Sequence, residues 1–233
     1  MPGGRGPNPW ERYFDDLSAG QVLFAMHARE YVDNLAAVVG LPASAVVLDF
    51  GCGFGLVAGL LAPKVSEVSL WDASANMRRA AEARVACVAN ARMREPHDLD
   101  PETSVLRFDL ILVNSVVQYM TADEFSGWLA SWRALLAPGG RLVVSDVVPP
   151  GHSPAADVFR VLHFARTHRF LARAVLEAAG DLRRYRRTRG TRPLLQLDRA
   201  DLVQRAAEAG LATTFIPNLT ALATRSATVH TAQ

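Results

Sequence analysis

Strand-like apolar runs alternate with helical stretches through the middle of the chain, and this alternation restricts the fold more than any other feature of the sequence. The apolar runs lie at 45–50, 65–71, 108–113 and 141–148, and the helical patterns at 56–61, 74–85 and 121–136. A further strand is expected within 86–95. Strands alternating with helices of this length form parallel βαβ units. We therefore predict an α/β fold with a doubly wound, mostly parallel sheet.

The segments on either side of this alternation have other patterns. Residues 1–9 are rich in Gly and Pro and are expected to form a disordered tail. Residues 10–42 have helical spacing and are expected to form an N-terminal helical cap. Residues 152–197 are expected to form a helical lid insert, with a helix at 155–179. The remainder is expected to contain a helix at 198–209 and short strands at 212–216 and 220–230. The prediction is a single domain over 10–233.

Composition limits the functional classes. The chain has 233 residues, half of them apolar, and a net charge of +2, which gives no general case for nucleic-acid binding. Its two cysteines, Cys52 and Cys87, form neither a disulfide framework nor a zinc motif. No apolar run is long enough to cross a bilayer, and the N-terminus lacks the apolar region of a secretory signal. The expectation is a cytoplasmic enzyme without a metal ion. Its oligomeric state is left open.

A glycine-rich loop follows the first strand in the segment VVLDFGCGFG, residues 46–55. Glycine lets a ligand approach the backbone because no Cβ intervenes. Such a ligand lies at the carboxyl ends of the strands, near a helix N-terminus. A dinucleotide loop needs a small third residue in G-x-G-x-x-G/A, where this chain has Leu56. The pattern here is G-x-G-x-G, preceded by Asp49.

Asp72 closes the second strand. A carboxylate at that position accepts hydrogen bonds from both hydroxyls of a ribose. The alternative is a tight turn followed by a surface aspartate, and the pairing of the loop with Asp72 argues against it. The two features together predict a ligand that contains a ribose but is not organised around a pyrophosphate.

With these motifs the chain resembles the class I S-adenosylmethionine-dependent methyltransferases, closely over residues 45–150. VVLDFGCGFG resembles their first motif, LWDASANM their second, FDLILVNSVVQYM their fourth, and LLAPGGRLVVSDV the strand-turn-strand that follows. The tail NLTALATRSATVH resembles the closing hairpin of small-molecule members, with Asn218 and Arg225 at matching places. The resemblance implies a seven-stranded sheet with an antiparallel last strand.

The resemblance also implies S-adenosylmethionine as cofactor and S-adenosylhomocysteine as product. Asp49 and the loop are expected around the methionine part, Asp72 at the ribose, Met77 near the adenine, and Asp98 near the adenine amino group. The full set of expected cofactor-binding residues is Asp49, Gly51, Cys52, Gly53, Gly55, Asp72, Ala73, Met77, Asp98 and Asn114.

The residues after the fourth strand narrow the methyl acceptor. Relatives that methylate DNA bases or protein amides have Pro-Pro-Tyr or Pro-Pro-Phe there, whereas this chain has NSVVQY at 114–119. That stretch resembles methyltransferases embedded in or associated with peptide and polyketide assembly lines. The expected substrate is a small metabolite in natural-product biosynthesis. Oxygen is favoured over nitrogen as the acceptor because no carboxylate cage for an amine is visible.

A catalytic base is needed only if the acceptor arrives protonated. Tyr119 follows the fourth strand and His152 follows the fifth, so both are expected at the carboxyl edge of the sheet. We predict that His152 or Tyr119 deprotonates or orients the acceptor. His27, His163 and His168 are further candidates on helices, and for any single histidine a structural role is the commoner one.

An arginine-dense segment follows the insert helix and contains Arg183, Arg184, Arg186, Arg187, Arg189 and Arg192. A solvated surface is one interpretation. An anionic substrate or an acidic carrier protein is another, and RNA backbone binding is a third. A single aromatic residue within the segment, Tyr185, gives RNA binding little support.

Three alternatives to a small-molecule methyltransferase stay open. The first is a non-methylating enzyme, such as a cyclase, that keeps the cofactor as a scaffold. The second is an RNA methyltransferase that uses the arginine-dense segment. The third is a dinucleotide oxidoreductase, which Leu56 argues against. Release of S-adenosylhomocysteine during turnover separates the first alternative from methyl transfer.

Overall fold

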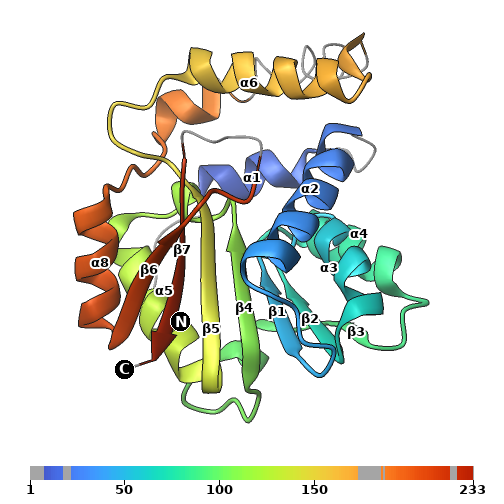
Figure 1. Cartoon of the computed structure of the whole chain (residues 1–233), viewed down its shortest axis with the longest axis vertical. Coiled ribbons are helices and arrows are strands. Elements are labelled where there is room, and N and C mark those ends of the chain that lie inside the picture. The colour runs from blue at the N-terminus through green and yellow to red at the C-terminus, as the bar shows by residue number, and fades with distance from the viewer. Residues whose placement is uncertain (1–7, 18–21, 173–184, 186, 221–224, 233) are drawn as a thin grey trace.

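The computed structural model describes residues 8–17, 22–172, 185, 187–220 and 225–232. One seven-stranded sheet organises this part of the chain, with the strand order β3-β2-β1-β4-β5-β7-β6 (Figure 1). The strands are β1 (Val46–Phe50), β2 (Glu67–Trp71), β3 (Ala91–Met93), β4 (Phe108–Asn114), β5 (Leu136–Val147), β6 (Leu211–Ile216) and β7 (Ser226–Ala232).

Strands β1 to β5 pair in parallel, and β7 runs antiparallel to both of its neighbours, β5 and β6. The fold predicted from the sequence, a doubly wound sheet with a reversed last strand, is therefore confirmed. The strand expected within 86–95 is β3, which has only three residues. The valine-rich central strands are buried on both faces because helices cover the sheet on both sides.

Helices cover both faces of the sheet. On one face lie α2 (Val22–Val38), α3 (Leu56–Leu61) and α4 (Ala75–Val85), whose apolar residues share a core with β1 and β2. On the other face lie α5 (Ala122–Leu135) and α8 (Arg199–Glu208), which pack against β4 and β5 around Trp132. Short 3₁₀ segments complete the domain: η1 (Ala62–Lys64), η2 (Pro96–Leu99) and η3 (Val117–Tyr119).

Side-chain caps fix where the helices behind the site begin. The Ser74 hydroxyl accepts a hydrogen bond from the Met77 N–H at 3.1 Å and starts α4 directly after Asp72. Thr121 and Glu124 form a capping box at the start of α5. Both caps lie at the carboxyl edge of the sheet, so the loops there have defined positions.

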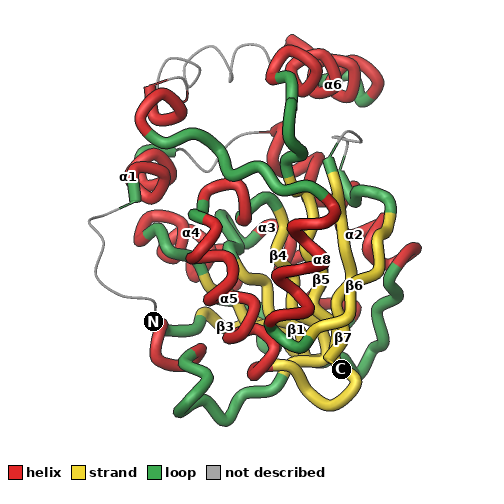
Figure 2. The backbone as a smooth tube through the Cα atoms, turned by 90° about the vertical axis from the view of Figure 1, so that its left-hand side faces the viewer, coloured by secondary structure: helices red, strands yellow, loops and turns green. Residues whose placement is uncertain are grey.

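Two further helices lie over that edge. The N-terminal cap begins with α1 (Pro9–Asp15), and α6 (Pro154–Thr167) follows β5. Figures 1 and 2 both show α6 above the carboxyl ends of the parallel strands. The helix predicted at 155–179 ends earlier, at Thr167, because Arg169 adopts a left-handed φ of 62°. The part of that prediction beyond 172 lies outside the described residues.

Candidate active site

Hydrogen bonds fasten the glycine-rich loop to the end of β2. The N–H groups of Gly51 and Cys52 donate to the carbonyl oxygen of Trp71 at 2.7 and 3.0 Å. The N–H of Gly53 donates to Oδ2 of Asp72 at 2.9 Å. The loop after β1 and the carboxylate after β2 therefore form one unit, as their spacing in the sequence predicts.

The three glycines of the loop have different surroundings. A Cβ on Gly51 would lie 2.3 Å from the side chain of Val116, so this position has no room for one. A Cβ on Gly53 would meet no atom within 4 Å, and Gly53 lines a cavity. A Cβ on Gly55 would press on Ala81 of α4 at 3.1 Å. Gly55 is absent from the cavity lining, so its place is in helix packing.

Asp49 is a buried ionisable residue with a carboxylate oxygen that accepts no hydrogen bond from the described residues. Its side chain is buried, and its Oδ2 atom has no hydrogen-bond partner among the described residues. Burial, together with the charge of Asp72, raises the pKa of Asp49 to about 7. Burial also raises the pKa of Asp72, although the N–H groups of Ser74 and Gly53 favour its charged form. Arg78 also lines the cavity and lowers the pKa of Asp72, but it donates its hydrogen bonds to the backbone carbonyls of Asp72 and Ala73 at 2.8 Å. The unpartnered Oδ2 of Asp49 therefore stays available to a ligand that carries positive charge.

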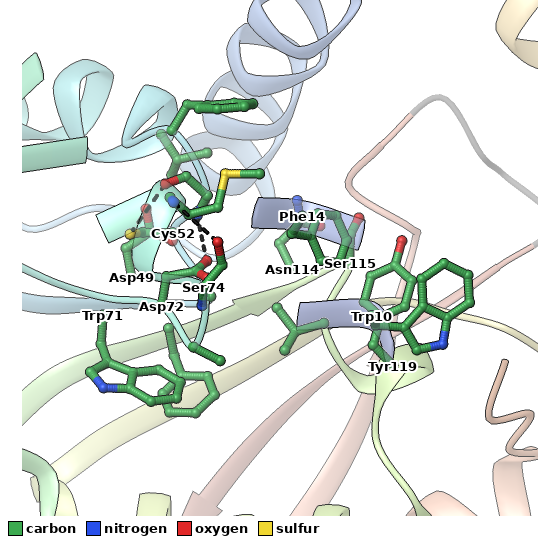
Figure 3. Close-up of a pocket in the computed structure, with 18 of the residues that line it drawn as sticks. Trp10, Phe14, Asp49, Cys52, Trp71, Asp72, Ser74, Asn114, Ser115 and Tyr119 are labelled. Carbon is green, nitrogen blue, oxygen red and sulfur yellow. Dashed lines mark hydrogen bonds between the residues drawn. The ribbon is translucent and has the colours of Figure 1, made fainter. Parts of the chain in front are cut away.

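The cavity has a volume of about 670 Å³ and lies at the carboxyl ends of β1, β2, β4 and β5. This volume is in the range of small-molecule and cofactor sites. Figure 3 shows Asp49, Cys52 and Asp72 at one end, Trp10 and Tyr119 at the other. The polar side chains of Asn114 and Ser115 lie between the two ends (Figure 3).

Aromatic rings form the second end of the cavity. The ring of Trp10 lies 4.8 Å from that of Tyr119, and the ring of Phe14 lies 5.0 Å from Tyr119, measured between centroids. Tyr185 packs on Trp10 at 5.6 Å. Helix α1 thus contributes the rings of Trp10 and Phe14 to this end of the cavity.

A buried ionic cluster lies at the end of β5, and its members Asp146 and Arg225 line the cavity. The Asp146 carboxylate accepts hydrogen bonds from Ser115 Oγ at 2.6 Å, from Arg225 at 2.9 Å and from Thr220 Oγ1 at 3.2 Å. Asn218 accepts the Asp146 N–H at 3.0 Å. Ser115 and Asp146 both adopt left-handed φ angles, 57° and 66°, which non-glycine residues rarely take.

The cluster extends from the sheet to α6. Arg225 donates to Asp157 Oδ2 at 2.5 Å, and His152 Nε2 lies 2.9 Å from the same oxygen. The His152 side chain is 2% exposed. Asn218 and Arg225, which the sequence marked only as supports of the closing hairpin, thus hold Asp146 in place.

The two predicted catalytic residues lie in different surroundings. Tyr119 lines the cavity, and burial raises the pKa of its phenol. His152 is not among the residues that line the cavity and contacts Asp157 instead. The structure therefore places Tyr119 in the cavity wall and His152 outside the lining, next to Asp157.

Most of the predicted cofactor-binding residues line the cavity. Ala73, Met77 and Asn114 do so together with Asp49, Asp72 and the loop. Asp98 caps η2 by accepting the Glu95 N–H at 2.9 Å and does not line the cavity, although its neighbour Pro96 does. Among the described residues no cluster of His, Cys, Asp or Glu is suited to a metal ion.

Several lining residues were not predicted from the sequence: Phe14, Trp10, Phe54, Trp71, Trp128, Ser115, Asp146 and Arg225. Trp71 could have been predicted from the sequence, since it directly precedes Asp72. The left-handed backbone at Ser115 and Asp146 leaves no sequence signal, because neither is a glycine. Of the arginine-dense segment, Arg192 pairs with Glu124 at 2.8 Å, while 183, 184 and 186 lie outside the described residues.

The sheet order, the loop bound to Asp72 and the cavity above them are typical of an α/β fold that binds a nucleoside-containing ligand. Comparison with known proteins agrees: residues 48–142 match the family described as "Methyltransferase domain". The match spans less than half of the chain, and the seven-stranded sheet has the Rossmann-like methyltransferase fold. None of its described helices has the length and apolar character needed to cross a membrane.

Similar proteins come from several settings. The chain is 35% identical over 144 residues to a probable non-canonical nonribosomal peptide synthetase of Salinispora arenicola, covering 57% of this chain and 2% of that protein. It is 33% identical over 106 residues to an uncharacterized methyltransferase of Mycobacterium tuberculosis, covering 45% of this chain and 51% of that one. The curated relatives are thus matched over about half of their length or far less.

A solved structure shares the fold. Magnesium protoporphyrin IX methyltransferase of Synechocystis, crystallised with S-adenosylmethionine, superposes with a TM-score of 0.58 at 16% identity, over 97% of this chain and 90% of that one. The cofactor expected from the sequence is the one bound in that protein.

Proposed function

We propose that this protein transfers the methyl group of S-adenosylmethionine to an oxygen or nitrogen of a small metabolite, with oxygen favoured. One observation carries the proposal. A single cavity joins the loop and its two carboxylates to an aromatic enclosure, so a cofactor and an acceptor have room side by side. Methyl transfer needs this proximity, because the reaction depends mainly on alignment of the reacting atoms.

The first end of the cavity supplies groups suited to the cofactor. The carboxylate of Asp72 accepts hydrogen bonds from the ribose hydroxyls, and the open backbone at Gly53 admits close contact. The unpartnered oxygen of Asp49 and its negative charge favour the cationic methionine part. When bound, the cofactor supplies a methyl group on a positively charged sulfur, which is already an activated donor.

The second end holds the acceptor. The aromatic rings exclude water, and the Tyr119 hydroxyl orients the acceptor by hydrogen bonding. His152 contacts Asp157 and not the cavity, so we assign it a positioning role. Through Asp157 it holds Arg225, which in turn fixes Asp146 beneath the acceptor.

We also propose that the protein acts in natural-product biosynthesis in the cytoplasm. Contact with an acidic carrier protein is part of this proposal. Similarity to a peptide synthetase and to the chondramide synthase of Chondromyces crocatus supports it. Residues 10–233 are proposed to form one domain, with α1–α2 as the cap and 152–197 as the lid.

Calorimetry and turnover test the function. S-adenosylmethionine and S-adenosylhomocysteine should bind to the purified protein, and NAD(H) should not. A panel of hydroxylated and amino metabolites should yield a methylated product and S-adenosylhomocysteine in equal amounts. Cofactor binding with a rearranged, unmethylated product would support the cyclase alternative. A salt-dependent gel shift with RNA would favour the RNA methyltransferase instead.

A further inference from the structure

His27 is a cavity-lining histidine that the functional assignment has not used. It lies on α2 and lines the cavity. Its Nε2 atom is buried and has no hydrogen-bond partner among the described residues. A buried polar atom without a partner costs roughly 1–3 kcal/mol. A ligand hydroxyl in the cavity would remove that cost.

The surroundings of His27 keep its imidazole neutral near pH 7. Burial lowers the pKa of His27, and the negative charge of Asp146 on β5 opposes this effect without overcoming it. From α6, the apolar ring of Phe164 packs against the imidazole at 4.9 Å between centroids. A neutral imidazole has one nitrogen lone pair that can take a proton.

The other candidate bases near the acceptor end are less suited. The Asp146 carboxylate already accepts from Ser115, Arg225 and Thr220. The phenol of Tyr119 has a raised pKa and stays protonated at neutral pH, so it donates and does not accept a proton. Glu11 also lines the cavity, and burial raises its pKa, so its carboxyl holds a proton more tightly than a usual glutamate does.

The walls of the cavity indicate the acceptor. The rings of Trp10, Phe14 and Tyr119 gather at one end, which suits a flat aromatic group. The Asp146 charge nearby is neutralised by Arg225 at 2.9 Å and is not offered to an ammonium group. A neutral base that lines the same cavity as these rings fits an aromatic hydroxyl better than an amine.

We propose that His27 is the catalytic base and that the acceptor is a hydroxyl on an aromatic ring. The inference rests on the proposed methyl transfer. His27 takes the hydroxyl proton on its free ring nitrogen while the acceptor oxygen forms a bond to the methyl carbon. The carbon–sulfur bond breaks, and its electron pair stays on sulfur, which becomes the thioether of S-adenosylhomocysteine. The protonated imidazole later releases its proton to water.

The test compares His27→Gln with His163→Gln, which makes the same change at an exposed position of α6. Calorimetry with S-adenosylmethionine comes first: both variants should bind it as the parent protein does. Failure of the parent protein to bind would contradict the proposed function and not the role of His27. With phenolic acceptors, His27→Gln should lower kcat by about 10²–10⁴-fold, the usual contribution of a general base.

A second comparison separates a base from a packing residue. In a series of phenols of falling pKa, the difference in kcat between the parent protein and His27→Gln should become smaller. An acceptor that is already ionised needs no base. At saturating cofactor, the kcat of the parent protein should rise with pH as the His27 imidazole loses its proton, at a pKa below the usual 6.5 of histidine. The kcat of His27→Gln should lack this rise. Nuclear magnetic resonance of the imidazole should report the same ionisation without turnover.

Three results would overturn the proposal. One is an equal loss of kcat for every phenol of the series. Another is a rise of kcat with pH that persists in His27→Gln and disappears in Glu11→Gln. The third is methylation of aromatic amines with no turnover of any aromatic hydroxyl. Recovery of the kcat of His27→Ala by added imidazole would support the assignment further.

Discussion

Replacing Asp49 by asparagine should make the free protein more stable while weakening its hold on the cofactor. The raised pKa of Asp49, about 7 against a usual 3.8, means that ionising this buried carboxyl is costly. A difference of about 3 pKa units at about 1.4 kcal/mol per unit corresponds to roughly 4 kcal/mol. Asparagine has a similar shape and no charge to bury.

The pH dependence of this cost has a defined sign. The folded protein holds the Asp49 proton more tightly than the unfolded chain does. The stabilisation by the protonated form is complete below pH about 4 and is lost as the pH rises through about 7. The asparagine variant should therefore gain most at pH 8 and little at pH 4.

The net gain will be smaller than the charge cost, because the new amide group also needs partners. Leaving one unpaired costs about 1–3 kcal/mol, so an increase of about 1–3 kcal/mol in the free energy of unfolding is expected at pH 8. For a chain of this length each kcal/mol raises Tm by roughly 2–4 °C.

Thermal unfolding of the cofactor-free protein at pH 4 and pH 8 measures this effect. Asp109→Asn is the matched control, because it makes the same chemical change on β4 at an exposed carboxylate that accepts the Val46 N–H at 2.8 Å. That control should change stability by less than about 0.5 kcal/mol. If Asp49→Asn were no more stable than the parent protein at pH 8, the reasoning from burial would be refuted. Calorimetry should show weaker S-adenosylmethionine binding for Asp49→Asn only.

Other substitutions test the remaining parts of the site. Asp72→Ala should weaken S-adenosylmethionine binding at least about tenfold in calorimetry, since it removes a charge-assisted hydrogen-bond acceptor worth about 1.5–3 kcal/mol. Gly51→Ala should destabilise the protein by about 1–3 kcal/mol in denaturant unfolding, because the added methyl would lie 2.3 Å from a side chain; Gly53→Ala, with open space around it, should cost less, and the reverse order would contradict the loop geometry. Arg225→Met should cost about 3–5 kcal/mol of stability, since it leaves Asp146 buried without its ion pair; a loss below 1 kcal/mol would mean that the cluster is dispensable.

The sheet and the cofactor end of the site were predictable because their signals are local. Valine-rich strands buried on both faces produce continuous apolar runs, and the loop beside Asp72 follows two neighbouring strands. The early end of α6 was not predictable, because Arg169 takes a left-handed backbone without being glycine. Strand β3 was only roughly placed, since it is short and lies at the edge of the sheet.

The rest of the cavity lining was much harder to predict. Its groups come from distant parts of the chain: Trp10 and His27 from the N-terminal helices, Asp146 from the end of β5, and Arg225 from the residues before β7. No spacing rule connects them. His152 follows β5 as expected, yet α6 turns it toward Asp157, and only the path of the backbone shows this.

The ionic cluster joins three segments that lie far apart in the sequence: the end of β5, the residues that follow it and the residues before β7. Asp157 belongs to α6, its partner Arg225 directly precedes β7, and the next carboxylate, Asp146, belongs to β5. An insert without a carboxylate at the place of Asp157 would leave the buried Arg225 with one ion-pair partner fewer. Chimeras made to change the acceptor would therefore have to exchange the insert and the last hairpin together.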